Sequence, residues 1–189
     1  MLLPLQTPIG SNFLKDFPAV HSVNNGLIDA YTGTPLTTHG LGTYTPQLKA
    51  STNNPTIGTG GIAVLRGFYY AIFDQVWTWG EFRFGTTGAS GGTGLYSITL
   101  PFTVLSVVGI SPGLSIGAQP VVGTGSVWSN ATPANRQPVT THLKSLTEIQ
   151  FSVKMNSGAP SREVASNSPF GWSPSDGMVW NARYQRVSS

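Results

Sequence analysis

The stretch that decides the fold is Val76-Trp77-Thr78-Trp79-Gly80-Glu81-Phe82-Arg83-Phe84-Gly85. Its residues separate into two alternating rows, which is the period of two that a β-strand imposes. The row that suits a core is Val76, Thr78, Gly80, Phe82 and Phe84. The other row mixes indoles with charges and consists of Trp77, Trp79, Glu81 and Arg83. The stretch therefore predicts a strand with one buried face and one outward face.

Strand patterns also flank this stretch on both sides. One precedes it as Gly67-Phe68-Tyr69-Tyr70-Ala71-Ile72, and another follows it as Leu95-Tyr96-Ser97-Ile98-Thr99-Leu100, which is ended by Pro101. Residues 85–94 lie between the second and third strands and are rich in glycine, which reaches the positive φ angles that bulkier residues avoid. We expect this glycine-rich segment to connect two strands.

The remainder of the chain after residue 60 continues the same pattern. Strands are expected near residues 62–72, 75–84, 95–100, 102–109, 120–128, 138–144, 147–155 and 178–187. The clearest alternation places Ile149, Phe151, Val153 and Met155 inward and Glu148, Gln150, Ser152 and Lys154 outward. The last inward row is Met178, Trp180, Ala182 and Tyr184. These patterns predict an all-β fold, an antiparallel β-sandwich of jelly-roll-like type.

The first 60 residues differ in composition from the rest. They contain six prolines among Gly, Asn and Thr, with only short apolar stretches. We therefore expect an extended N-terminal attachment arm over residues 1–60, followed by the β-sandwich domain over residues 61–189. The arm's apolar residues would serve as docking anchors: Leu14, Phe17, Val20, Leu27, Ile28 and Tyr31.

Composition limits the kinds of surface that this chain can present. Charged residues make up only 9% of the chain, against about 25% in ordinary soluble domains, and Gly and Pro supply 23 and 14 residues. A surface of Ser, Thr, Asn and Gly that is partly buried against other subunits accounts for this composition. The alternative is a monomeric sandwich with a weakly charged surface.

The charged and metal-binding residues form no recognisable reactive group. The ten Lys and Arg residues are scattered rather than clustered, so nucleic-acid binding is not expected. Cysteine is absent, which excludes disulfides and thiolate zinc sites, and His21, His39 and His142 lack metal-ligand spacing. The carboxylates show no pairing of the kind that glycoside hydrolysis needs. We expect no enzyme activity, no cofactor and no metal.

Several of these motifs occur together in a known family. The block resembles the C-terminal β-domain of minor tail and fibre-like virion proteins of tailed phages of Gram-positive bacteria. The matching segments are Gly67-Phe68-Tyr69, Val76 to Gly85, Tyr96 to Pro101, and a closing element from Ser168 to Gly177 followed by Trp180 and Tyr184. The chain departs from the family at Phe73-Asp74-Gln75, where a small or Gly-containing turn is common.

The resemblance implies a non-enzymatic virion structural protein, a minor tail or tail-fibre component. Such a protein would form a homotrimer, dock to other virion proteins through its arm and contact the host receptor with its sandwich. It would be made in the host cytoplasm, since no signal peptide precedes the arm, and would lie on the virion exterior without a membrane partner. The alternatives are a capsid decoration protein and a carbohydrate-binding module.

Aromatic side chains are the best lead to a binding site. Flat aromatic faces bind sugars, and the outward row of the deciding strand could stack on a host cell-wall glycan. Packing of its tryptophans against a neighbouring subunit or the opposite sheet is the competing interpretation, and the one that we favour. The candidate residues for glycan or subunit contact are Trp77, Trp79, Glu81, Arg83, Trp128, Asn130 and Arg136.

Overall fold

The computed structural model describes residues 40–105, 118–131, 136–154 and 161–187. Within these ranges the regular elements are ten strands: β1 Gly40–Tyr44, β2 Leu48–Ala50, β3 Val64–Ile72, β4 Gln75–Arg83, β5 Tyr96–Thr99, β6 Val121–Trp128, β7 Gln137–Leu143, β8 Glu148–Val153, β9 Arg162–Glu163 and β10 Gly177–Gln185. The described residues include no helix with the length and apolarity needed to span a membrane.

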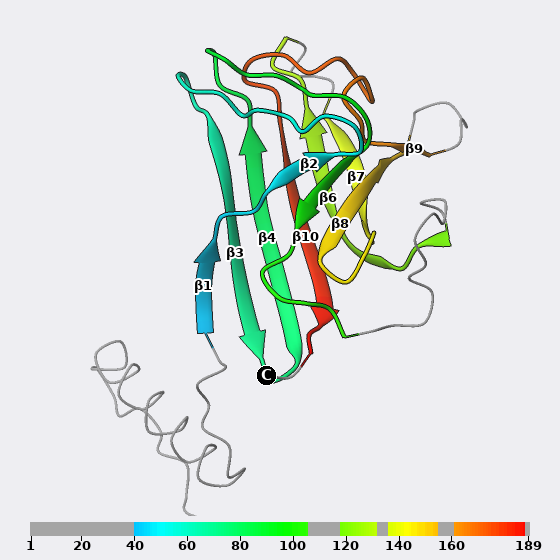
Figure 1. Ribbon diagram of the computed structural model, residues 1–189. Coiled ribbons are helices and arrows are strands. Elements are labelled where there is room, and N and C mark those ends of the chain that lie inside the picture. Colours follow the sequence, from blue (N-terminus) through cyan, green and yellow to red (C-terminus); the bar gives the residue numbers. More distant parts are fainter. Residues whose placement is uncertain (1–39, 106–117, 132–135, 155–160, 188–189) are drawn as a thin grey trace, which may run out of the picture. The chain divides into compact units, whose positions relative to one another are not determined.

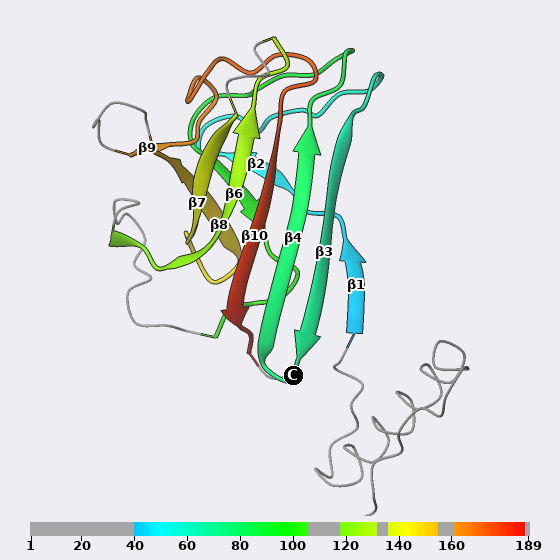
Figure 2. The ribbon, with the colours of Figure 1, turned by 180° about the vertical axis from the view of Figure 1, so that it is seen from behind.

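The strands form one continuous sheet that curls over itself. Its order is β1-β3-β4-β10-β6-β7-β8-β5-β2, and β9 adds to β8. In Figure 1, β2 crosses in front of the long strands β4 and β10, whereas Figure 2 shows β1, β3, β4 and β10 side by side from behind. Every neighbouring pair is antiparallel. The predicted all-β antiparallel sandwich is confirmed, and its two layers belong to a single sheet.

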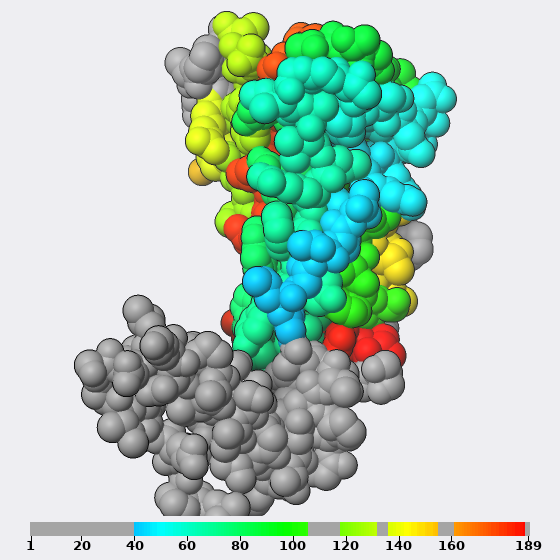
Figure 3. Space-filling model, turned by 90° about the vertical axis from the view of Figure 1, so that its left-hand side faces the viewer, coloured from blue at the N-terminus to red at the C-terminus, as the bar shows by residue number. Residues whose placement is uncertain are grey.

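Two strands lie inside the segment that the sequence predicted to be an arm. β1 pairs with β3, with Gly42 opposite Tyr69, and β2 pairs with β5, with Leu48 opposite Ile98. The compact unit that contains the sheet begins at Gly40 rather than at residue 61. Both strands are short and occupy the two ends of the sheet, and β1 lies along the surface in Figure 3. β2 has only three residues and β1 includes two glycines, so neither strand carries a clear alternation, which is why the sequence pattern missed them.

The remaining arm prediction concerns residues 1–39, which lie outside the described residues. The six proposed docking anchors therefore stay predictions: Leu14, Phe17, Val20, Leu27, Ile28 and Tyr31.

The strand expected at 102–109 is wrong in its described part. Residues 102–105 form only an isolated bridge, between Val104 and Arg186.

The core is built from the inward rows that the sequence indicated. On β4, Val76, Thr78 and Phe82 are buried, and the inward rows of β8 and β10 are buried as well. Gly80 interrupts the large side chains of β4 because the Trp180 indole lies over it from the paired β10 residue, and a Cβ at position 80 would collide with that ring. Met155, which was expected to continue the β8 row, lies outside the described residues.

β8 is buried on both faces, which the alternation did not predict. Gln150 and Ser152, expected to face outward, are each 6% exposed. Gln150 donates to the Gln119 side chain at 2.7 Å, and Ser152 shares a 2.9 Å hydrogen bond with the ring of His142. His142 is thus buried. Burial lowers its pKa, against the opposing effect of its hydrogen bond with the backbone of Gln119.

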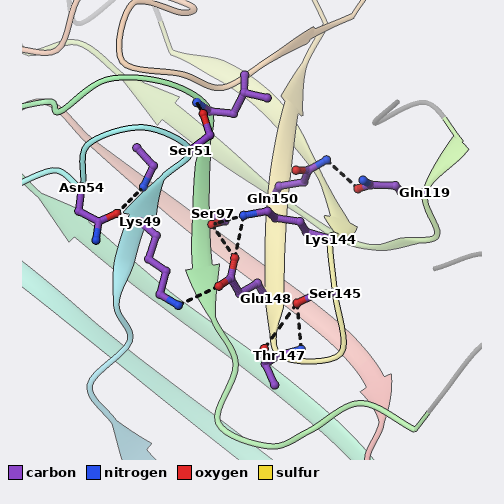
Figure 4. Close-up of polar contacts among 12 residues, drawn as sticks. Lys49, Ser51, Asn54, Ser97, Gln119, Lys144, Ser145, Thr147, Glu148 and Gln150 are labelled. Carbon is purple, nitrogen blue, oxygen red and sulfur yellow. Dashed lines mark hydrogen bonds and ion pairs between the residues drawn. The ribbon is translucent and has the colours of Figure 1, made fainter. Parts of the chain in front are cut away.

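An ionic cluster joins the three strands at the far end of the sheet. The Glu148 carboxylate on β8 accepts from Lys49 on β2 at 2.8 Å, from Lys144 at 2.8 Å and from Ser97 on β5 at 2.9 Å, as Figure 4 shows. Burial alone would raise the pKa of Glu148, but these hydrogen bonds outweigh it and lower the pKa from 4.5 to about 2. The carboxylate is therefore held ionised.

The Glu148→Gln variant is expected to unfold more easily, and by an amount that depends on pH. A depressed carboxyl pKa stabilises the folded state above the unfolded value, and that contribution is lost as pH falls from 4.5 towards about 2. At pH 7 we expect the free energy of unfolding in urea to fall by about 1–2 kcal/mol. Glu81→Gln, whose partner Arg66 is exposed, is the control with a smaller effect. An equal loss for Glu148→Gln at pH 7 and pH 2.5 would contradict this account.

The turn between β3 and β4 is short and contains no glycine. Only Phe73 and Asp74 connect the two strands, and Phe73 has a φ of 52°, in the left-handed region. Left-handed backbone is unfavourable for a residue with a bulky side chain and is tolerated by Asn. The tight hairpin thus forms without glycine, at the cost of local strain.

Relief of this strain should be visible in the stability of position-73 variants. Phe73→Asn should be more stable than Phe73→Ala by about 1 kcal/mol, because Asn tolerates the left-handed region and Ala does not. The comparison with Ala removes any effect of losing the ring. Equal urea unfolding midpoints for the two variants would show that the turn is not strained.

Candidate functional site

The outer face of β3 and β4 carries two cross-strand aromatic pairs. Phe68 stacks on Trp79 with ring centroids 5.9 Å apart and planes 16° apart, and Tyr70 lies 6.1 Å from Trp77. Each pair is directly opposite in the strand register, where side chains reinforce one another. Both tryptophans point away from the core, so neither packs against the opposite layer of the sandwich. Trp79 is 39% exposed.

Arginine side chains lie over these rings. The guanidinium carbon of Arg183 on β10 is 4.9 Å from the Trp77 ring centroid, and that of Arg66 on β3 is 5.8 Å from the Phe68 ring. Arg66 also donates from Nε to Glu81 at 2.7 Å. We call this surface the aromatic–arginine face, which comprises Arg66, Phe68, Tyr70, Trp77, Trp79, Glu81, Arg83 and Arg183.

A cavity opens at the end of this face where β4 finishes and β6 ends. Its volume is about 350 Å³, and it is lined by Glu81, Arg83, Trp128, Ser129, Asn130, Arg136 and Val179. The guanidinium carbons of Arg83 and Arg136 lie 5.3 Å and 5.5 Å from the Trp128 ring centroid. Five of the seven predicted contact residues thus meet here: Glu81, Arg83, Trp128, Asn130 and Arg136. Trp77 and Trp79 follow along the same face of β4, outside the cavity lining.

A carboxylate that the sequence did not single out positions one wall of the cavity. Asp176 is fully buried, and its two oxygens accept from the backbone N–H of Asn130 at 2.6 Å and of Ser173 at 2.7 Å. It therefore fastens the end of the β6 segment to the turn before β10. The Ser-x-x-Asp spacing of that turn is the sequence signal, but the long-range partner Asn130 could not be inferred from it.

The closing element that carried part of the family resemblance has a structural role here. Trp172 donates from its indole N–H to the Ala165 carbonyl at 2.7 Å. Its ring packs at 5.1–5.7 Å, centroid to centroid, against four others, which are Phe82, Phe84, Tyr96 and Phe170. The tryptophan closes the end of the sandwich beneath the loops.

The carboxylates of Glu81, Glu148 and Asp176 are engaged in ion pairs and hydrogen bonds to backbone N–H groups. The described part of the chain contains no cluster of three or more His, Asp or Glu side chains that could hold a metal ion. Glu81 pairs with Arg66, Glu148 with two lysines, and Asp176 with backbone N–H groups. What the outer face presents is indole rings and guanidinium groups, which bind flat rings and anions.

No family model, curated protein or solved structure matches this chain. Its kinship with phage tail proteins therefore stays a prediction from the short motifs quoted above.

Asp176→Asn is expected to lower the free energy of unfolding by about 2–3 kcal/mol, because the amide turns a donor towards a backbone N–H and loses the charge that strengthens both hydrogen bonds. Asp74→Asn in the β3–β4 turn is the matched control and should change stability by less than about 0.5 kcal/mol. Thermal or urea unfolding measures both. Equal effects of the two substitutions would show that Asp176 does not fasten the segment at Asn130.

Proposed function

We propose that this protein is a non-enzymatic virion structural protein of a tailed phage, a minor tail or tail-fibre component that uses its β-sandwich for assembly and host-surface contact. The observation that carries the proposal is the aromatic–arginine face. Tyr, Trp, Phe and Arg are the residues enriched at contact surfaces and at their energetic hot spots. Here they occupy one outer face of the sheet in a chain with only 9% charged residues.

The position of these residues favours recognition. They stand on β3, β4 and β10, each of which has a hydrogen-bonded strand on both sides, so little conformational freedom is lost when a partner binds. Stacking and cation–π contacts hold the side chains in place before any contact is made. In this proposal residues 1–39 dock to other virion proteins, and the sandwich assembles as a homotrimer.

A second candidate is a carbohydrate-binding module. The observation that favours it is the cavity beside Trp128, which lies next to exposed Trp79 on the same face and is of a size that suits a small ligand. In this alternative the protein acts as a monomer that binds host cell-wall glycan.

Gold-conjugated antibodies against the purified protein should label the host-contacting end of the tail on intact virions in electron micrographs. Labelling of the head would identify the protein as a capsid decoration protein, and unlabelled particles would contradict a virion role.

Light scattering after size exclusion should give the mass of a trimer. A monomer that binds host cell walls would favour the carbohydrate-binding module instead.

A substitution in the aromatic–arginine face can test its role in binding, with a control for effects on folding. Trp79→Ala should weaken binding to isolated host cell walls or lower the trimer fraction at least tenfold, because it removes the most exposed indole of the face. Leu146→Ala is the control, since this side chain is similarly exposed but lies in the turn between β7 and β8. Unchanged cell-wall binding and an unchanged mass in Trp79→Ala would show that the face takes part neither in host-surface contact nor in subunit assembly.

A further inference from the structure

We propose that the cavity beside Trp128 binds the anionic group of an acidic carbohydrate, a sugar that carries a phosphate or a carboxylate, between Arg83 and Arg136. That the anion is carried by a sugar rests on the proposed function of host-surface contact. The preference for an anion rests on the cavity alone.

The charges around the cavity favour an anion. Neither Arg83 nor Arg136 forms an ion pair with any described residue. The one carboxylate in the lining, Glu81, is neutralised by Arg66 from outside the cavity. The buried Asp176 is unexposed, and its oxygens accept from backbone N–H groups. Two guanidinium groups thus face the cavity with their charges uncompensated.

The arginines also hold hydrogen-bond donors that the protein leaves unused. The Nε–H of Arg83 is buried and has no partner among the described residues. Arg136 uses its Nε to donate to Ser126 Oγ at 3.1 Å, which fixes the side chain and leaves the terminal nitrogens of its guanidinium for a ligand. Planar guanidinium groups bind carboxylates and phosphates through paired donors.

Trp128 orders the two cations rather than serving as a platform for a sugar. Both guanidinium groups lie over its ring, at 5.3 Å and 5.5 Å. Cation–π contact with this one ring holds both arginines in place at the cavity, so the site is organised before the ligand arrives. The sugar would then lie against Val179 and Asn130, in a cavity whose volume of about 350 Å³ accommodates a single sugar unit.

The test is calorimetric titration of the full chain with glucose 1-phosphate, glucuronate and glucose at low salt. Either charged sugar should bind at least tenfold more tightly than glucose, and added salt should weaken that binding. Arg136→Gln and Arg83→Gln should each reduce the affinity at least tenfold. Arg162→Gln is the matched control, because Arg162 is an exposed residue of β9 that lines no part of the cavity, and it should leave the affinity unchanged.

One further variant separates loss of the guanidinium donors from loss of charge and checks the folding of the chain. Arg83→Lys keeps the charge but loses the planar donor pair, so it should also weaken binding while the circular dichroism spectrum stays that of the parent. Equal binding of glucose and glucose 1-phosphate would overturn the proposal, as would a loss of affinity in Arg162→Gln equal to that in Arg83→Gln. Self-association that Arg83→Gln abolishes, without sugar binding by the parent, would identify an acidic side chain of a second copy as the occupant and overturn the carbohydrate.

The failure of this site and the failure of the proposed function give different results. If the parent binds the charged sugars, the double variant with Arg83→Gln and Arg136→Gln does not, and the virion is labelled as expected, both proposals are supported. If the parent binds neither charged sugar, the site is overturned even where labelling finds the protein on the tail. If the charged sugars bind as expected but virions are unlabelled, the anion site is supported and the virion role fails.

Discussion

The register between β4 and β10 is the constraint on which the rest of the structure depends. Gly80 stands opposite Trp180, and this pairing lets the indole lie over bare backbone in the middle of the core. A slip of one residue would turn every side chain of one strand to the opposite face. The same register that fills the core therefore sends Trp77 and Arg183 outward as a directly opposed pair. Core packing and the outer binding surface are two results of one alignment.

Alternation along single strands could be deduced from the sequence, and it located the core. Phe82, Phe151 and Trp180 belong to rows whose period of two is unbroken, so their burial followed from spacing alone. The same logic placed Trp79 on the outer face. The pattern failed on β8, because Gln150 and Ser152 are covered on their polar side through partners that come from other parts of the chain, such as Gln119 and His142.

Contacts between distant segments could not be predicted, because a single sequence contains no record of them. The sequence marked Arg83, Trp128 and Arg136 as contact candidates without any indication that both arginines lie over the one indole ring. Asp176 was visible only as a turn residue, although its bond to Asn130 shapes the cavity wall. Sequence patterns can therefore select residue types that suit binding, whereas the cavity itself arises from strand order, which brings β4, β10 and β6 together.

The direction of β1 has a mechanical consequence. Gly40, where the sheet begins, stands opposite Ala71, which in turn pairs with Val76, so it lies at the end of the strands away from Arg83 and the cavity. If the protein is anchored through the chain before Gly40 and held at the cavity, tension runs along the strand axes. Hydrogen bonds of an antiparallel pair are perpendicular to that axis, so the β1–β3 bonds are loaded together in shear rather than opened one after another. A sheet loaded in this direction resists pulling between those two points.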